Sequence, residues 1–140
     1  MNDDEVRAFL TSDPARTGKL ATTRRDGSPH VAPIWYVLDD DGTILFTTAE
    51  DSVKGRTLRR DPRAAMCVDD DRPPFSYVIV RGTVELIDDL AQLRHWAGII
   101  GGRYMGADQA DAFGARNGVP GELLARLHPT HTVSEQDVAL

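Results

Sequence analysis

The sequence has a single cysteine, Cys67, among its 140 residues. One thiol can form neither a disulfide within the chain nor a thiolate metal cluster, which is typical of a reducing compartment, so we expect a cytoplasmic protein. The four histidines are dispersed, and the closest two, His128 and His131, flank Pro129 in a strand-like segment. Because this spacing does not bring both rings to one ion, we expect no metal site.

Long apolar runs are also absent. The chain begins with the acidic segment MNDDEVRAFL, and no stretch approaches the ~20 apolar residues that a membrane-spanning helix needs. The formal net charge is −6, and a negative long-range field repels nucleic acid and anionic membranes. We therefore expect neither a membrane span nor a nucleic-acid partner, whereas a small anion could still be bound locally.

The motifs of several common enzyme classes are missing. The sequence contains no G-x-S-x-G, H-E-x-x-H, P-loop or G-x-G-x-x-G pattern. Hydrolases with a nucleophile elbow, zinc proteases and proteins with nucleotide-binding loops therefore have no support in the sequence. No catalytic side chain can be named from these patterns.

Short strands separated by turns dominate the sequence. Alternating residues at 20–25 lead to Asp26-Gly27, a strong tight-turn signal, and a second strand follows at 28–39. The prolines at 29 and 33 cannot donate to a sheet ladder, so this strand should lie at an edge or be broken near Pro33. With a strand at 43–48 we expect a three-strand antiparallel meander. Further strands are expected at 64–69, 75–88 and 122–133.

Helices are few and short. We expect them at 3–11, after the acidic turn near residue 52, at 89–104 and at 108–116. Gly82 lies where a long strand of a barrel would bend. About six strands without βαβ alternation favour a closed or partly closed antiparallel barrel, and the length predicts a single domain over residues 1–140.

The segment from Ile44 to Arg63, ILFTTAEDSVKGRTLRRDPR, is the most informative part of the chain. Five of the sixteen Lys and Arg residues lie within its last ten positions. A strand that ends in hydroxyls and leads into a helix with cations in its first turn offers side-chain donors, free backbone N–H groups and positive charge. We predict a phosphate-binding turn made of Thr47, Thr48, Ser52, Lys54 and Arg56. We assign Arg59, Arg60 and Arg63 to the solvated surface or to peripheral contacts.

The pattern FTT…SVKGRTLRRDPRAAMCVDD…FSYVIVRGTVEL, preceded by LATTRRDGSPHVAPIWYVLDDDG, resembles the flavin and deazaflavin oxidoreductases related to pyridoxamine 5′-phosphate oxidase. Within that superfamily it is most similar to the F420-dependent class. The resemblance covers residues 16–135. It implies a mainly β fold, a split β-barrel of about six antiparallel strands with a few short helices. It also implies a homodimer with cofactor sites at the subunit interface.

The resemblance also suggests which cofactor is bound. FMN-dependent members carry a basic pair in the second strand to hold the flavin phosphate, whereas SPHVAPIWYV has no Lys or Arg. This difference favours coenzyme F420, with FMN as the alternative. By resemblance, the residues of the phosphate turn are those given above, although Ser52 stands where some relatives have a basic residue. His30, Pro33 and Ile34 match the strand beside the deazaflavin ring, and Phe75 matches an aromatic position near the cofactor or a packing residue at the barrel mouth.

The resemblance implies an oxidoreductase that transfers a hydride between reduced F420 and an unsaturated small organic substrate. Two alternatives remain from the sequence: an FMN-dependent oxidoreductase of the same fold, and a non-catalytic carrier of F420, flavin or tetrapyrrole. A basic helix that only contacts another protein is a third. Trp35 and Trp96 are interpreted as packing residues of the core or the dimer interface.

Overall fold

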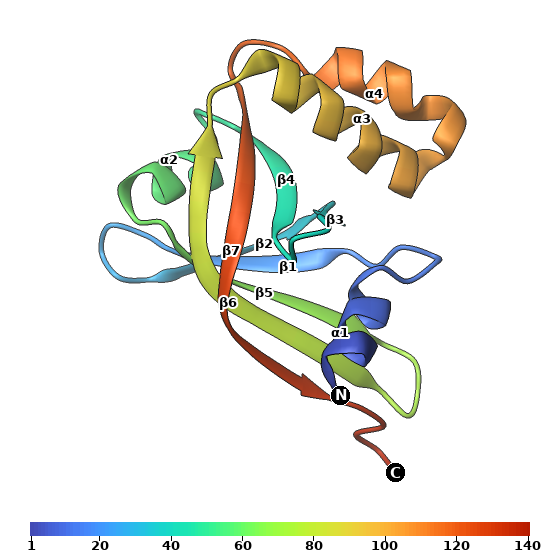
Figure 1. Ribbon diagram of the computed structural model, residues 1–140. Coiled ribbons are helices and arrows are strands. Elements are labelled where there is room, and N and C mark those ends of the chain that lie inside the picture. Colours follow the sequence, from blue (N-terminus) through green and yellow to red (C-terminus); the bar gives the residue numbers. More distant parts are fainter.

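The computed structural model describes all 140 residues, as seven strands, four α-helices and one short 3-10 helix (Figure 1). The strands are β1 (Gly18–Thr23), β2 (Pro29–Ile34), β3 (Val37–Leu38), β4 (Ile44–Ala49), β5 (Arg63–Asp70), β6 (Ser76–Ile87) and β7 (Glu122–Glu135). The helices are α1 (Asp3–Leu10), α2 (Val53–Arg60), α3 (Leu90–Met105), η1 (Ala107–Gln109) and α4 (Ala110–Asn117).

The strands form one antiparallel sheet in the order β2-β1-β5-β6-β7-β4-β3. The sheet curls into a partly closed barrel, with α3 and α4 packed side by side at one end (Figure 1). This confirms the mainly β split-barrel class. The strand count is seven rather than about six, because the segment expected as one strand at 28–39 forms both β2 and β3.

The split of that segment corrects the expected meander. β2 is an edge strand, as its prolines predicted, but β3 pairs with β4 at the opposite edge, so β2 and β4 are not neighbours. The break lies at Trp35 and Tyr36. The N–H of Tyr36 donates to the Tyr104 hydroxyl at 3.3 Å, and the Tyr36 carbonyl accepts from Arg103 Nη1 at 2.6 Å. Side chains of α3 therefore satisfy the backbone where the ladder ends.

β6 and β7 are the long strands that bend across the barrel. Their register shifts between Arg81 and Gly82, which confirms the bend predicted at Gly82. A Cβ at Gly82 would lie 2.0 Å from the His128 carbonyl oxygen, so the close approach of the two backbones requires glycine.

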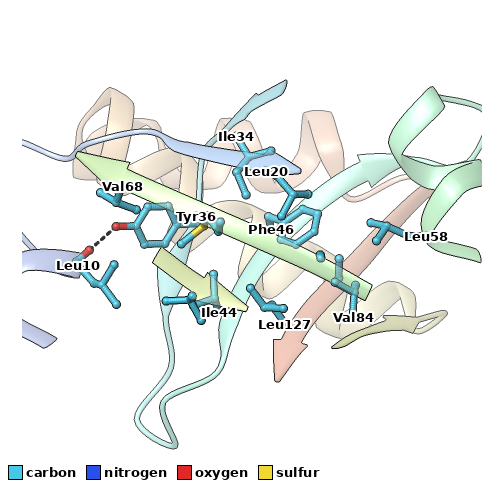
Figure 2. Close-up of a cluster of buried hydrophobic side chains, with 14 of the residues drawn as sticks. Leu10, Leu20, Ile34, Tyr36, Ile44, Phe46, Leu58, Val68, Val84 and Leu127 are labelled. Atoms are coloured by element: carbon cyan, nitrogen blue, oxygen red, sulfur yellow. Dashed lines mark hydrogen bonds between the residues drawn. The ribbon is translucent and has the colours of Figure 1, made fainter. Parts of the chain in front are cut away.

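The barrel interior is a cluster of fifteen buried residues (Figure 2). Tyr36 is fully buried there, and its hydroxyl donates to the Leu10 carbonyl at 2.7 Å, which ties α1 to the barrel. Leu58 of α2 is 2% exposed and belongs to the same cluster as Phe46 of β4. α2 is therefore anchored in the core and has a fixed position beside β4.

The other face of β4 is covered by α3. Leu45 belongs to a second buried cluster with Leu93 and Ile100 of α3, while its neighbour Phe46 points into the barrel. β4, which leads into the turn before α2, is therefore packed on both faces. No helix of the structure combines the length and the apolar character needed to cross a membrane.

Candidate cofactor site

The turn between β4 and α2 is organised by the hydroxyl of Ser52. This oxygen accepts the backbone N–H of Gly55 at 3.0 Å, donates to the Ala49 carbonyl at 2.7 Å and lies 3.0 Å from Thr48 Oγ1. Thr48 is only 4% exposed. Ser52 is thus the N-cap of α2, and its hydroxyl and that of Thr48 shape the turn. Thr47 lies on the opposite face of β4 and does not contact them.

The first turn of α2 presents two free backbone donors. The N–H groups of Val53 and Lys54 have no hydrogen-bond acceptor in the chain. The helix start is pressed against the end of β4, because a Cβ at Gly55 would lie 2.2 Å from the Ala49 carbonyl oxygen. Free amides and the helix dipole favour an anion at this point.

Lys54 projects from this turn with its ammonium partly buried. Burial lowers the pKa of Lys54, and the negative charge of Glu122 partly opposes that shift. No carboxylate lies within ion-pair distance of Lys54 Nζ. A partly desolvated cation without a direct partner gains more from a bound anion than a fully hydrated one does.

The arginines that follow Lys54 in the sequence lie in different surroundings. Arg63 forms an ion pair with Asp61 at 2.7 Å, and Arg59 lies at a separate, partly apolar concavity beside Leu58. Arg56 and Arg60 instead line a concavity of about 290 Å³ on the side of α2 that faces the β1–β2 hairpin. The structure thus separates Arg56 and Arg60 from Arg59 and Arg63, and the phosphate contact predicted for Arg56 stays a prediction.

The side chains of β2 do not form one wall. Ile34 is 5% exposed and belongs to the barrel core, and His30 lies on the same inward face of the strand. Pro33 and Val31 point outward, and Val31 is 62% exposed. The predicted ring-contacting residues are thus close along β2 but point to both sides of it.

Two buried polar atoms on the inward face of this edge lack partners. Thr22 of β1 pairs directly with His30 of β2, and neither Thr22 Oγ1 nor His30 Nδ1 has a hydrogen-bond partner. Thr22 is 3% exposed. Because buried polar atoms are nearly always bonded, this pair marks a place where a polar ligand atom fits. The sequence carried no signal for Thr22, since its environment depends on strand pairing.

Phe75 lies far from the turn within one chain. It ends the loop between β5 and β6, at the end of β5 opposite α2, and its carbonyl accepts the N–H of Val138 at 2.8 Å. Phe75 is 42% exposed and has φ +64°, an uncommon conformation for an aromatic residue. The structure does not bring Phe75 to the phosphate turn of the same chain, and its predicted place near a cofactor stays a prediction.

Trp35 is a packing residue of the helical end of the barrel. Its ring stacks on Tyr104 at 5.2 Å between centroids and meets Phe113 edge-on at 5.7 Å. Trp96 packs against the second buried cluster under α3. The interpretation of both tryptophans as packing residues is consistent with these contacts, which attach α3 and α4 to the β2–β3 connection.

The outward face of five strands is uncovered. Strand register aligns one row across them, Val31, Ala21, Ala65, Arg81 and His131, and a second row, Pro33, Lys19, Cys67, Ile79 and Val133. Most members are small or apolar, and Val133 is 44% exposed. Exposed apolar faces of this breadth are typical of association surfaces.

A free cation, free helix amides and orphaned polar atoms are what a phosphate-bearing heterocycle requires, so the residues present fit such a cofactor. A family model described as pyridoxamine 5′-phosphate oxidase matches residues 2–132. The chain is 36% identical over 86 residues to the pyridoxine/pyridoxamine 5′-phosphate oxidase of Rhizobium etli. That match covers 61% of this chain and only 40% of the Rhizobium enzyme.

Two solved structures are similar to this chain over most of its length. A conserved hypothetical protein of Mycobacterium tuberculosis superposes with a TM-score of 0.85 at 29% identity, covering 98% of this chain and 86% of that one. A protein named F420 reductase superposes with a TM-score of 0.68 at 30% identity, covering 90% of this chain and 94% of that one. The similarity thus extends over nearly the whole barrel.

Proposed function

The chain belongs to the pyridoxamine 5′-phosphate oxidase family, and from that premise we propose that it is an F420-dependent oxidoreductase acting on an unsaturated small organic substrate. Bound F420 would supply the hydride chemistry. The protein's own part is to hold the cofactor's phosphate, orient the ring and exclude water from it.

The unpaired Lys54 ammonium beside the free N–H groups of Val53 and Lys54 carries this proposal. Three donors, one of them charged and partly buried, lie at the start of α2. A phosphate diester accepts bonds from all of them, and Arg56, two positions further along α2, adds positive charge on the side of the helix that faces the β1–β2 hairpin. Ser52 and Thr48 would keep these donors in place.

The composition of β2 favours F420 over FMN. No residue from Pro29 to Ile34 is Lys or Arg, so β2 lacks the basic pair that would hold a flavin phosphate. The orphaned atoms of Thr22 and His30 instead suit uncharged polar atoms of a ring or its side chain. The similarity to the protein named F420 reductase supports the same choice.

The outward apolar face of β2, β1 and β5 leads us to include a homodimer in the proposal. A second copy would cover Val31 and Pro33, which are exposed in one chain. Such an interface would shield the neighbouring ring site from water, which strengthens electrostatic contacts inside it.

Titration of the purified protein with F420 and with FMN, followed by tryptophan fluorescence, tests the cofactor. We expect saturable quenching with F420 and a much weaker response to FMN. Reduced F420 is then mixed with a panel of enones and quinones, and its reoxidation is followed by absorbance. Tight FMN binding without an F420 response would overturn the choice of cofactor. F420 binding without reoxidation by any compound would indicate a carrier.

A further inference from the structure

The β1–β2 hairpin folds back against α2. Arg60 Nη2 of the helix donates to the Thr23 carbonyl of the hairpin at 2.6 Å. This contact brings Arg24 and Arg25, which follow β1, to the same concavity of about 290 Å³ that Arg56 and Arg60 line. Two segments separated by about thirty positions in the sequence thus converge into one basic groove, defined by these four arginines.

No carboxylate lies within ion-pair distance of any of the four guanidinium groups, although the charges of Arg24 and Arg60 act on the nearby Asp26 and Asp61. The nearest acid of the hairpin, Asp26, accepts hydrogen bonds from the Ser28 amide and hydroxyl at 2.9 and 2.6 Å, and those bonds lower the pKa of Asp26. The acid at the end of α2, Asp61, is paired with Arg63. Four like charges therefore share one small volume, in a chain whose net charge is −6.

Arginines of an ordinary solvated helix point apart and bond to neighbouring acids. The basic groove differs, because its cations come from two elements and face a common space, and a bound polyanion would relieve their repulsion. The remaining lining residues are Val53 and the buried Thr57, so the groove has a small floor with few polar competitors. Its volume suits a ligand the size of a few phosphate or carboxylate groups.

We propose that the basic groove binds a small ligand with two or more adjacent anionic groups, either phosphates or carboxylates. Planar guanidinium groups match both by paired hydrogen bonds. Two sources of such a ligand exist. One, which rests on the proposed function, is the glutamyl tail of F420 extending from Lys54. The other is a separate oligophosphate.

Calorimetric titration with inorganic tripolyphosphate tests the groove without any cofactor. We expect binding by the unaltered protein that weakens as salt is added, and a loss of affinity of about tenfold or more in the double variant Arg24→Ala/Arg25→Ala. Arg59→Ala is the matched control, since it removes one exposed cation from α2 outside the groove. Its affinity should stay within about twofold, as expected when only a distant, screened charge is lost.

No tripolyphosphate binding by the unaltered protein, or equal affinity in the double variant, would overturn the proposal. Circular dichroism of the double variant shows whether it has folded, and Arg24→Lys/Arg25→Lys provides a milder test that keeps the charge. Competition separates the sources: F420 with a long glutamyl tail displaces tripolyphosphate if the tail occupies the groove, and both bind together if it does not. Because tripolyphosphate binding does not require F420, failure of the proposed function would be seen separately, in the cofactor titration.

Discussion

Lys54 at the start of α2 and Glu122 at the start of β7 lie close enough for each charge to act on the other, but they do not form an ion pair. Burial lowers the pKa of Lys54 and raises that of Glu122, and each charge partly opposes the other's shift. Asp51 also raises the pKa of Glu122. The fold thus holds a cation and an anion that are both incompletely compensated. A bound phosphate would compete with Glu122 for Lys54.

Lys54→Ala should weaken F420 binding by about 1 to 3 kcal/mol, the range for loss of a charged hydrogen bond. Fluorescence titration measures the change in Kd. Arg59→Ala serves as the control because it leaves the turn intact. An unchanged Kd in Lys54→Ala would assign this lysine to the solvated surface.

Glu122→Gln should act in the opposite direction. Removing the carboxylate takes away a competitor for Lys54, so the anionic cofactor binds more tightly at pH 7. Because the pKa of Glu122 is raised in the folded state, its contribution to the free energy of unfolding is fully present below the unfolded pKa. That contribution is lost as the pH rises through the folded pKa. The glutamine variant should therefore be more stable at pH 7, by less than about 1 kcal/mol since the site is partly exposed. Near pH 3 the two proteins should unfold alike, and urea denaturation at both pH values checks this.

Gly55→Ala separates helix propensity from packing. Alanine favours a helix over glycine by about 1 kcal/mol. However, the new Cβ would meet the Ala49 carbonyl oxygen at 2.2 Å, and overpacking costs about 1 to 3 kcal/mol or more. We expect net destabilisation together with weaker cofactor binding, because the start of α2 must move. Unfolding in urea measures the first effect. A more stable variant would show that the helix can shift freely.

Tyr36 provides a pH test of the core. Burial raises the pKa of Tyr36 to about 12 from 10.0. The phenol therefore contributes stability that is fully present below pH 10 and is lost between pH 10 and 12. The loss is about 2 to 3 kcal/mol for this shift.

The variant Tyr36→Phe should lack this alkaline transition. At pH 7 it should cost about 1 kcal/mol, since the Leu10 carbonyl keeps its bond from Arg103. Denaturant unfolding from pH 8 to 12 is the measurement, and the unaltered protein, which keeps the Tyr36 phenol, is the comparison. If Tyr36→Phe lost as much stability between pH 10 and 12 as the unaltered protein, the alkaline transition would arise from another group.

Local signals made most strands and helices predictable. Asp26-Gly27 marked the first hairpin, Gly82 the bend of β6, and Pro33 the edge position of β2. The prediction of a three-strand meander was wrong because the break in the strand at Tyr36 depends on side chains of α3, which lie about seventy positions away in the sequence. A local sequence pattern could not predict the strand order either, because β7 pairs with both β6 and β4.

In the candidate site, too, some features could be predicted from the local sequence and others depend on the fold. Ser52 was expected as a ligand contact because hydroxyls bind phosphate, but three neighbouring groups in the turn already use its oxygen. Arg24 and Arg25 gave no signal, since only the folded hairpin brings them to α2. The position of Lys54 in the first turn of α2 could be predicted from the sequence, because that position is set by residues beside it, whereas its contact with a cofactor stays a prediction.

Val31→Asp tests the proposed subunit interface and its link to the cofactor. Val31 is 62% exposed in one chain and lies in the outward row with Ala21 and Ala65. If a second copy covers this row, a charge at its edge would be buried without a partner on both sides of a two-fold axis, which costs several kcal/mol. We expect a monomer by light scattering and a large loss of F420 affinity. Val138→Asp, at a 49% exposed position near the C-terminus, is the control. A Val31→Asp dimer with unchanged affinity would place the interface elsewhere, whereas a monomer that still binds F420 tightly would show that one chain completes the cofactor site.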